Sequence, residues 1–392
     1  MTFDLAIYRL ATGLGRPLLP AYLRRRVRQG KELEERLLER WGRSDLPRSD
    51  GRLVWVHAAS LGESNMMLPV IREAVARGGS VVLTTQTVSA AEVMGQSLPE
   101  GAVHQFAPVD TGSAVRRFLD HWRPDAVLFA ESELWPNMLR EVRRRGIPAA
   151  LVNARMNADS LARWGKRVAS FRELMGTFAV VLPADMATKA GLEGMLGRAL
   201  PQAENLKFAG VPEVDREVAE ALRAGLGDGP FWCAANVHPD EVGMIRDYAE
   251  DVKGATCVWL PRYPDRVEAY AFRTDDRVVA RFGVAAEAYS LCDWVLMGGS
   301  FHSGLKGHNP LEPAHLGKPV ATGPHVASFA DVYADYHAAM GATQGELLER
   351  AKGWSVDARQ LAEDAKRAKA FASAKAGVLA RVMDRLAPVL GA

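Results

Sequence analysis

Short apolar runs rich in β-branched residues alternate with helical patterns along most of this chain. Examples are residues 52–59, 80–86 and 125–131, and longer stretches with helical periodicity separate most of the runs. A helix between two strands carries the chain back to the end of the sheet where the first strand began, so the next strand runs parallel to it. This alternation therefore predicts parallel sheets covered by helices on both faces. The other runs that we expect to be strands are residues 148–154, 178–184, 230–235, 255–261, 293–298 and 318–323.

The length of the chain predicts two such α/β domains. It has 392 residues, and one domain usually takes about 100–200. A stretch rich in small and polar residues at 191–206 separates the two series of expected strands. We therefore expect two Rossmann-like halves with a boundary near residues 200–225. Charged helical patterns also predict a helix over residues 31–41 and a helical tail from about 355 to 390.

The N-terminal segment differs from the rest of the chain. Residues 5–31 carry seven positive charges and no acidic residue, and an apolar stretch at 10–23 is interrupted by Arg16, Pro17 and Pro20. A helix that spans a membrane needs about 20 mostly apolar residues, so this stretch is too short and too broken. We interpret it as a monotopic anchor with arginines on anionic headgroups. The alternative is a basic helix packed on the protein's own surface.

Composition excludes several classes of protein. Lys plus Arg number 49 against 47 Asp plus Glu, a net charge of +2, so we expect no nucleic-acid partner. Cys233, Cys257 and Cys292 form no CxxC pair, which fits a reduced cytosolic setting and excludes a thiolate zinc site.

Ligands of open α/β sheets bind at the carboxyl ends of the strands, so the segments after the strands are the candidate site. The first is HAASLGES, in which Ser60 and Gly62 allow a tight turn and Glu63 lies near the start of the next helix. Facing a crevice, Glu63 could accept a proton from a substrate hydroxyl as a general base. The structural alternative is a carboxylate that only complements the helix dipole.

Two further segments follow neighbouring strands. In ESELWPN, Glu131 and Glu133 are two residues apart, so in extended backbone both point to one face. Buried carboxylates need a cation or a ligand's hydroxyl groups. Arg155, after the next strand, carries a planar cation suited to a carboxylate or phosphate.

The second half places Arg262 directly after the strand at 255–261, and a glycine-rich segment at 298–319 leads into Asn309 and Glu312. Backbone N–H groups in such a turn suit a nucleotide phosphate. Neither GxGxxG nor GxxxxGK[ST] is present, so a nicotinamide-dependent oxidoreductase or a P-loop protein lacks its fingerprint. No acidic pair suited to a divalent metal is visible, so we expect no metal and no cofactor.

Six segments taken together resemble one family. HAASLGE, ESELWPN, NARMN, NLKF, PRYPDR and GHNPLEP occur in the order and approximate spacing of the 3-deoxy-D-manno-octulosonic acid (Kdo) transferases. These are inverting glycosyltransferases that attach Kdo to the lipid A precursor. The resemblance covers nearly the whole chain, including the basic N-terminal segment.

The resemblance implies a GT-B fold, in which two Rossmann-like domains face each other. Residues 1–42 would be the membrane-associated segment, 43–205 the acceptor-binding domain, and 206–392 the domain that binds the CMP-sugar donor and carries the C-terminal helix. Glu63 would be the general base, and Glu131 and Lys207 would stabilise the transition state; Lys207 rests on the resemblance alone. The CMP site would use Pro261, Arg262, Phe282, Gly283, Val284, Asn309, Pro310, Leu311 and Glu312, with Ser60, Gly62, Glu133, Arg155 and His308 as further substrate contacts.

The implied partners are CMP-Kdo, the lipid A precursor (lipid IVA) and a membrane surface, with the enzyme at the cytoplasmic face of the inner membrane. The donor half departs from the family pattern: residues 234–241 retain His238 and Glu241 but lose hydroxyl residues, Tyr263 follows Arg262, and Val284 replaces a carboxylate. Two alternatives therefore stay open. One is a related GT-B transferase with another donor sugar or lipid acceptor, and the other is a catalytically weak paralogue that acts as a binding protein.

Overall fold

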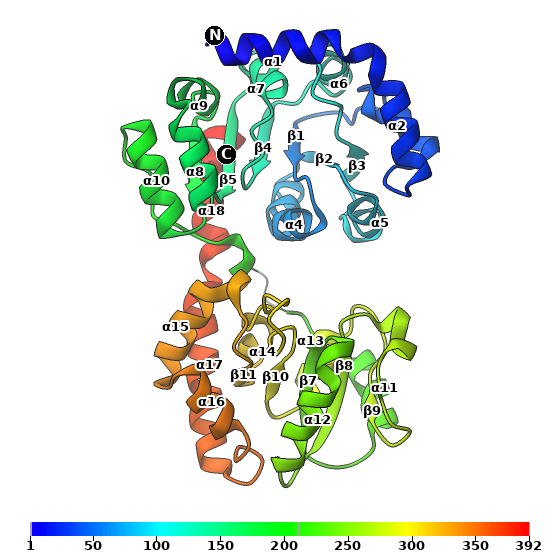
Figure 1. Cartoon of the computed structure of the whole chain (residues 1–392), viewed down its shortest axis with the longest axis vertical. Helices are drawn as coiled ribbons and strands as arrows, with labels where there is room; N and C mark the ends of the chain where they lie inside the picture. The colour runs from blue at the N-terminus through cyan, green and yellow to red at the C-terminus, as the bar shows by residue number, and fades with distance from the viewer. Residues whose placement is uncertain (1, 210–211, 392) are drawn as a thin grey trace. The chain divides into compact units, whose positions relative to one another are not determined.

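The computed structural model describes residues 2–209 and 212–391 and divides into two compact units (Figure 1). The first unit comprises Met1–Ala209 together with Val378–Ala392, and the second comprises Gly210–Gly377. Each unit is built on its own parallel sheet.

The first unit contains a 6-stranded sheet in the order β3-β2-β1-β4-β5-β6. Every neighbouring pair is parallel, and β1 lies in the middle between β2 and β4. The strands are β1 (Leu53–His57), β2 (Ser80–Thr85), β3 (Ala102–Phe106), β4 (Ala126–Ala130), β5 (Ala149–Ala154) and β6 (Val180–Pro183).

Helices follow each of these strands, and most begin with a side-chain cap. Ser60, Thr87, Thr111, Asn157 and Asp185 each accept a hydrogen bond from a backbone N–H of the helix they precede, which satisfies donors that the first turn leaves unpaired. The helices are α1 (Phe3–Leu14), α2 (Leu19–Arg28), α3 (Leu37–Arg40), α4 (Leu61–Ala76), α5 (Val88–Ser97), α6 (Gly112–Trp122), α7 (Pro136–Arg144), α8 (Ala158–Gly165), α9 (Val168–Met175), α10 (Met186–Leu196) and α18 (Val378–Leu390).

The second unit contains a 5-stranded sheet in the order β11-β10-β7-β8-β9, also parallel. Its strands are β7 (Phe231–Val237), β8 (Thr256–Pro261), β9 (Arg277–Val278), β10 (Val295–Met297) and β11 (Val320–Thr322). Its helices are α11 (Arg216–Leu226), α12 (Val242–Asp251), α13 (Ala285–Leu291), α14 (Leu311–His315), α15 (Ala330–Met340), α16 (Gln344–Ala351) and α17 (Ala358–Ala376).

These elements confirm the predicted α/β class with two Rossmann-like units, and each apolar run expected to be a strand overlaps one. Two edge strands, β3 and β9, were not predicted. The helix expected over residues 31–41 is wrong for most of its length, because only Leu37–Arg40 is α-helical, after a 3₁₀ turn at Glu34–Arg36.

The C-terminal helix also differs from the prediction, which placed it in the second domain. The predicted helical tail consists of two helices. The first, α17, ends at Ala376, and the second, α18, packs in the first unit against β4, β5 and β6. Figure 1 draws α18 in red beside β5. Its buried face consists of Val378, Val382, Met383, Leu386, Val389 and Leu390.

The N-terminal helix α1 is fastened to the first unit by polar contacts. The Tyr8 hydroxyl donates to Asp110 Oδ2 at 3.0 Å, and Asn137 Nδ2 donates to Thr12 Oγ1 at 3.1 Å. At the start of the helix, the Thr2 backbone N–H donates to Glu173 Oε2 at 2.6 Å. Within the described residues, no helix has the length and apolar character that crossing a membrane requires.

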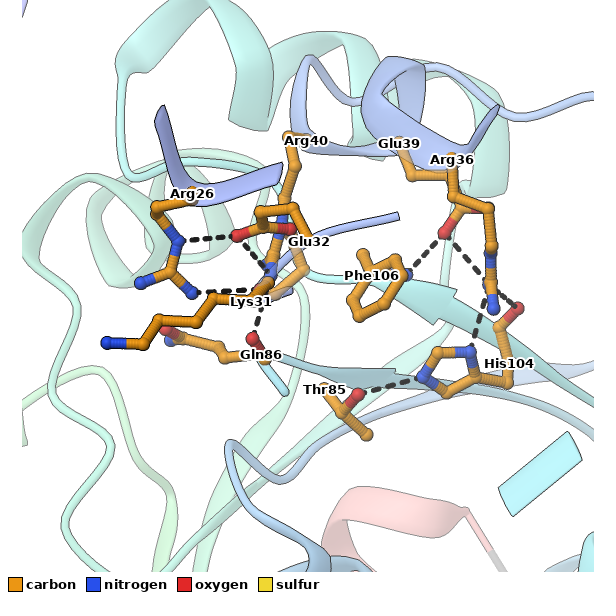
Figure 2. A network of polar contacts seen from close by, with 11 residues as sticks. Arg26, Lys31, Glu32, Arg36, Glu39, Arg40, Thr85, Gln86, His104 and Phe106 are labelled. Carbon is orange, nitrogen blue, oxygen red and sulfur yellow. Dashed lines mark hydrogen bonds and ion pairs between the residues drawn. The ribbon is translucent and has the colours of Figure 1, made fainter. Parts of the chain in front are cut away.

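A buried ion pair fixes the segment after α2 to the edge of the sheet (Figure 2). Arg40 and Glu32 are both buried, and two guanidinium nitrogens of Arg40 donate to the two carboxylate oxygens of Glu32 at 2.9 and 3.0 Å. Arg26 donates to the same carboxylate at 2.8 Å, and Arg40 also donates to the backbone oxygens of Gln86 and Ala107. This pair therefore joins α2 and α3 to the ends of β2 and β3.

A second contact lies beside it in Figure 2. Glu39 accepts the backbone N–H of Phe106 at 2.6 Å, and Arg36 donates to the backbone oxygen of His104 at 3.1 Å. Arg36 also approaches His104 Nδ1 at 3.0 Å, so this nitrogen is the acceptor and Nε2–H faces Thr85. Burial and the charges of Arg36 and Arg40 lower the pKa of His104 to about 3, and the ring is therefore neutral at physiological pH.

We predict that Glu32→Ala destabilises the first unit by about 3 kcal/mol, because it leaves the buried Arg40 without its carboxylate partner. Urea denaturation followed by tryptophan fluorescence measures the change. The control is Glu34→Ala, an exposed position two residues away, which should leave the midpoint almost unchanged. Equal midpoints for the two variants would contradict a stabilising role for the buried pair.

Candidate active site

The strand order of the first sheet defines where a ligand can bind. The chain runs from β1 outward to β2 and β3, then returns to β4 on the other side of β1 and continues to β5 and β6. Crossover helices on the two sides of this reversal cover opposite faces and leave a crevice outside the carboxyl ends of β1 and β4. The segments that follow these two strands carry Glu63, Glu131 and Glu133.

Glu63 lies in the first turn of α4 and makes two hydrogen bonds. The Ser60 hydroxyl donates to Oε1 at 2.8 Å, and the Ala59 backbone N–H donates to Oε2 at 2.9 Å. This is a reciprocal cap, because Ser60 Oγ also accepts the Glu63 backbone N–H at 3.3 Å. Burial raises the pKa of the Glu63 carboxyl, and so do the charges of Glu133 and Glu131, while the two hydrogen bonds oppose the rise.

Lys207 reaches the same site from a distant part of the sequence. Its Nζ lies 3.5 Å from Glu131 Oε1. The 3₁₀ turn at Leu206–Phe208 that carries it is held by Asn153, whose side-chain oxygen accepts the Leu206 backbone N–H at 2.8 Å. The Asn205 side chain accepts the Lys207 N–H at 3.0 Å. A residue identified by family resemblance alone is therefore paired with a carboxylate selected from the sequence.

The extended backbone expected over Glu131 and Glu133 is not formed, and the two carboxylates have different partners. Glu131 has φ of 48°, which ends the strand geometry at that residue. Glu133 accordingly turns toward His57, with Oε2 3.4 Å from His57 Nε2, and accepts a hydrogen bond from Trp135 Nε1. Burial acts to raise the pKa of Glu133, but the contacts with His57 and Trp135 outweigh it and the pKa is lowered.

His57 is a site residue that the sequence reasoning did not select. It is fully buried at the end of β1, with Nδ1 2.9 Å from Thr84 Oγ1. Thr84 Oγ1 also accepts the Trp55 indole N–H at 2.8 Å. The other ring nitrogen of His57, Nε2, faces the Glu133 carboxylate. The sequence signal that could have identified it is a histidine at the end of an otherwise apolar strand.

The remaining predicted residues of this unit have other surroundings. Arg155 Nε lies 3.5 Å from Oδ2 of Asp185, the residue that caps α10. Ser60 is the cap of α4, and Gly62 is exposed in its first turn.

The second unit gathers a cation and two histidines at the ends of its strands. Arg262 follows the buried Pro261, the last residue of β8, and its side chain is exposed. The rings of His238 and His308 stack with centroids 5.8 Å apart. Burial, together with the charges of Arg262 and His238, lowers the pKa of His308 to about 4. The strand order of this sheet reverses between β7 and β10, and the segments that follow these two strands carry His238 and His308.

In the first part of the glycine-rich segment after β10, residues 299–301, the backbone N–H groups bind a carboxylate of the protein itself and not a phosphate. The backbone N–H groups of Gly299, Ser300 and Phe301 donate to the carboxylate of Glu241 at 2.7–2.8 Å. Glu241 is fully buried and also accepts the His238 N–H at 2.9 Å. A side chain of the protein therefore already occupies this anion-binding turn.

The other predicted donor residues lie on two short segments. Asn309 accepts the Leu311 N–H through its side-chain oxygen at 3.1 Å, and Pro310 precedes α14, whose first turn carries the exposed Glu312. Before α13, Phe282 and Gly283 are exposed, whereas the Val284 side chain is buried.

Two parallel-sheet Rossmann-like units, each with polar groups at a reversal of strand order, define the GT-B class of glycosyltransferases and related epimerases. Two solved structures share this fold. One is a UDP-GlcNAc 2-epimerase from Neisseria meningitidis bound to UDP-GlcNAc, with TM-score 0.58, 14% identity, and coverage of 86% of this chain and 100% of that one. The other is the Streptomyces sp. SF2575 glycosyltransferase SsfS6, with TM-score 0.52, 16% identity, and coverage of 85% and 100%.

Sequence comparison identifies the family within this class. Residues 35–210 match the family described as 3-deoxy-D-manno-octulosonic-acid transferase (kdotransferase). A 3-deoxy-D-manno-octulosonic acid transferase of Bordetella pertussis is 30% identical over 98% of this chain and 99% of its own length. A probable mitochondrial transferase of the same name from Arabidopsis thaliana is 33% identical over 84% of this chain and 81% of its own. The chain belongs to the Kdo transferases and is therefore a glycosyltransferase.

We predict that Glu241→Ala destabilises the second unit by about 2–3 kcal/mol, because it leaves several buried N–H donors without an acceptor. Amide hydrogen exchange of residues 298–301 should also accelerate. Asp240→Ala, an exposed neighbour, is the matched control and should change neither measurement. Unchanged exchange in Glu241→Ala would show that the turn holds its shape without the carboxylate.

Proposed function

We propose that this enzyme transfers Kdo from CMP-Kdo to a sugar hydroxyl of the lipid A precursor lipid IVA, with inversion and without a metal ion. Membership of the Kdo transferases supports the transferred sugar. The observation that carries the acceptor side is the placement of Glu63 beside Glu131, Glu133 and Lys207, at the strand-order reversal of the first sheet.

In this proposal Glu63 is the general base. The acceptor hydroxyl gives its proton to the Glu63 carboxylate as its oxygen bonds to the anomeric carbon of Kdo, and the bond from that carbon to the CMP phosphate breaks. One base and no covalent intermediate give inversion by direct displacement. Burial and the neighbouring carboxylates raise the pKa of Glu63, which strengthens it as a base. Lys207 balances the charge of Glu131 at 3.5 Å.

The second unit would bind the nucleotide. Arg262 supplies a permanent cation for the departing phosphate, and its charge already acts on His308. With Glu241 filling the glycine-rich turn, the phosphate contacts fall to Arg262 and the segment 309–312. Residues Pro261 and 282–284 would complete the contacts with CMP.

We predict that Glu63→Gln lowers kcat by about 10²–10⁴-fold while CMP affinity stays nearly unchanged. Ser60→Ala is the matched control: it removes the cap hydroxyl but keeps the carboxylate, so it separates loss of the base from loss of the helix cap. The assay follows transfer from CMP-Kdo to lipid IVA by mass spectrometry in buffer containing EDTA.

The pH profile gives a second readout of the same variant. Because the pKa of Glu63 is raised, the wild-type rate should rise with pH through a limb above the usual range of a glutamate, as the base becomes ionised. Glu63→Gln should lack that limb. A Gln variant with more than about a tenth of wild-type kcat would refute the assignment, and so would complete loss of wild-type activity in EDTA that Mg²⁺ restores.

The N-terminal helices support the proposal that the enzyme associates with the cytoplasmic face of the inner membrane as a monotopic or peripheral protein. α1 packs one face on the first unit through Leu5 and Tyr8. A stripe of large apolar side chains stays exposed along α1 and the turn after it. The members of this apolar stripe are Phe3, Ile7, Leu10, Leu14 and Leu18.

We predict that Leu10→Gln/Leu14→Gln/Leu18→Gln abolishes flotation with anionic vesicles, because the side chains that would enter the interface become polar. The fold should persist, since all three are exposed. A matched control replaces three exposed apolar residues elsewhere: Val93→Gln/Met186→Gln/Met244→Gln.

Raised salt should weaken wild-type binding, because the arginines contribute through electrostatic attraction that salt screens. Wild-type protein that resists both high salt and alkaline carbonate would be integral rather than monotopic. Wild-type protein that never floats would show that the helix serves only the protein's own surface.

A further inference from the structure

A hollow of about 680 Å³ lies beneath the end of α1 in the first unit. Three arginines line it from parts of the sequence that are far apart: Arg16 from the turn after α1, Arg43 from the segment after α3, and Arg117 from α6. The remaining lining residues are Gly13, Pro17, Pro20, Leu38 and Trp41. No acidic side chain is among them.

The charges of these arginines are not neutralised by carboxylates. Among the residues that the structure describes, no ion pair involves Arg16, Arg43 or Arg117, whereas Arg26, Arg36 and Arg40 nearby all pair with glutamates. Arg117 Nε donates to the Trp41 backbone oxygen at 2.8 Å, which fixes its side chain.

Electrostatics at Arg117 agree with this geometry. Partial burial lowers the pKa of Arg117, and the like charges of Arg16, Arg43 and Arg116 lower it further. Holding like charges around one hollow costs free energy that an anion bound among them would recover.

The hollow and the apolar stripe share one segment of the chain. Leu14 and Leu18, which belong to the stripe, flank the lining residues Arg16 and Pro17 in the sequence and are 72% and 74% exposed. Leu38, which lines the hollow, is 51% exposed. A ligand that satisfies both features carries a compact anion joined to hydrocarbon chains.

We propose that this hollow binds the phosphomonoester headgroup of a membrane lipid. Up to three guanidinium groups would bond the phosphate oxygens, while the acyl chains would lie against Leu14 and Leu18. The proposal rests on the membrane association proposed above and is independent of the transfer reaction. A site of this kind, in which arginines from separate segments surround one hollow, differs from a surface that is only basic, such as the exposed arginines of α2.

The test compares two triple variants of the full-length protein with equal loss of charge. Arg16→Gln/Arg43→Gln/Arg117→Gln removes the hollow's cations, and Arg24→Gln/Arg25→Gln/Arg28→Gln removes exposed arginines of α2. Binding is measured on phosphatidylcholine vesicles that contain phosphatidic acid, a phosphomonoester, or phosphatidylserine, a phosphodiester, adjusted to equal surface potential.

We expect wild-type protein to prefer phosphatidic acid by about tenfold, as charge-assisted bonds to a phosphomonoester add to the general attraction. The α2 triple should bind both vesicles more weakly and keep the preference, whereas the hollow triple should lose it. Because Arg117 also bonds Trp41, the double variant Arg16→Gln/Arg43→Gln provides a second measure in which that contact is intact, and it should lower the preference as well.

Several outcomes would overturn the proposal. Equal wild-type binding to the two vesicles, or equal loss of preference in both triples, would show general electrostatic attraction. Competition by glycerol 3-phosphate at micromolar concentration would identify a soluble phosphate as the ligand, since a lipid site should need the chains.

A wild-type protein that transfers no Kdo but keeps the preference for phosphatidic acid would refute the proposed reaction and still support this lipid site.

Discussion

The reversal of strand order is the constraint on which the rest of the structure depends. A parallel sheet brings every strand's carboxyl end to one edge, and only where the order reverses do the crossover helices separate and leave space there. In the first sheet this point lies between β1 and β4, and the segments after these strands carry Glu63, Glu131 and Glu133. In the second it lies between β7 and β10, whose following segments carry His238 and His308. Neither site needs a specialised fold, because topology alone gathers residues that are distant in the sequence.

Central strands could be predicted from the sequence, and edge strands could not. A strand buried on both faces is mostly apolar, and such a run stands out in the sequence. In β1 each residue is buried, and all but the last, His57, are apolar. β3 lies at the edge and reads AVHQF, with His104 and Gln105 bonded to other segments, so no apolar run marks it. β9 has only two residues. Which unit a helix joins is also a tertiary property: α18 is amphipathic in sequence, but its docking against β4–β6 depends on which sheet face remains uncovered.

In the candidate site, positions could be predicted but pairings could not. The prediction that Glu63, Glu131 and Arg262 lie in the segments that follow strands is confirmed. It did not show that Arg155 pairs with Asp185, or that Glu131 adopts positive φ and separates from Glu133. The glycine-rich turn had the composition of a phosphate loop, yet an internal carboxylate satisfies its donors. Sequence shows which groups can bond, while the choice among internal partners, ligand and water is made by packing.

The return of α18 to the first unit has a consequence for biosynthesis. The second unit is a continuous insertion between residue 209 and residue 378 of the first. During translation the first unit emerges early, but the face of β4, β5 and β6 that α18 covers stays bare until the whole second unit has left the ribosome. A nascent chain thus carries an exposed apolar surface through nearly half of its synthesis. Early termination anywhere in the second unit removes the helix that closes the first, so truncated products present an open sheet face to chaperones and proteases.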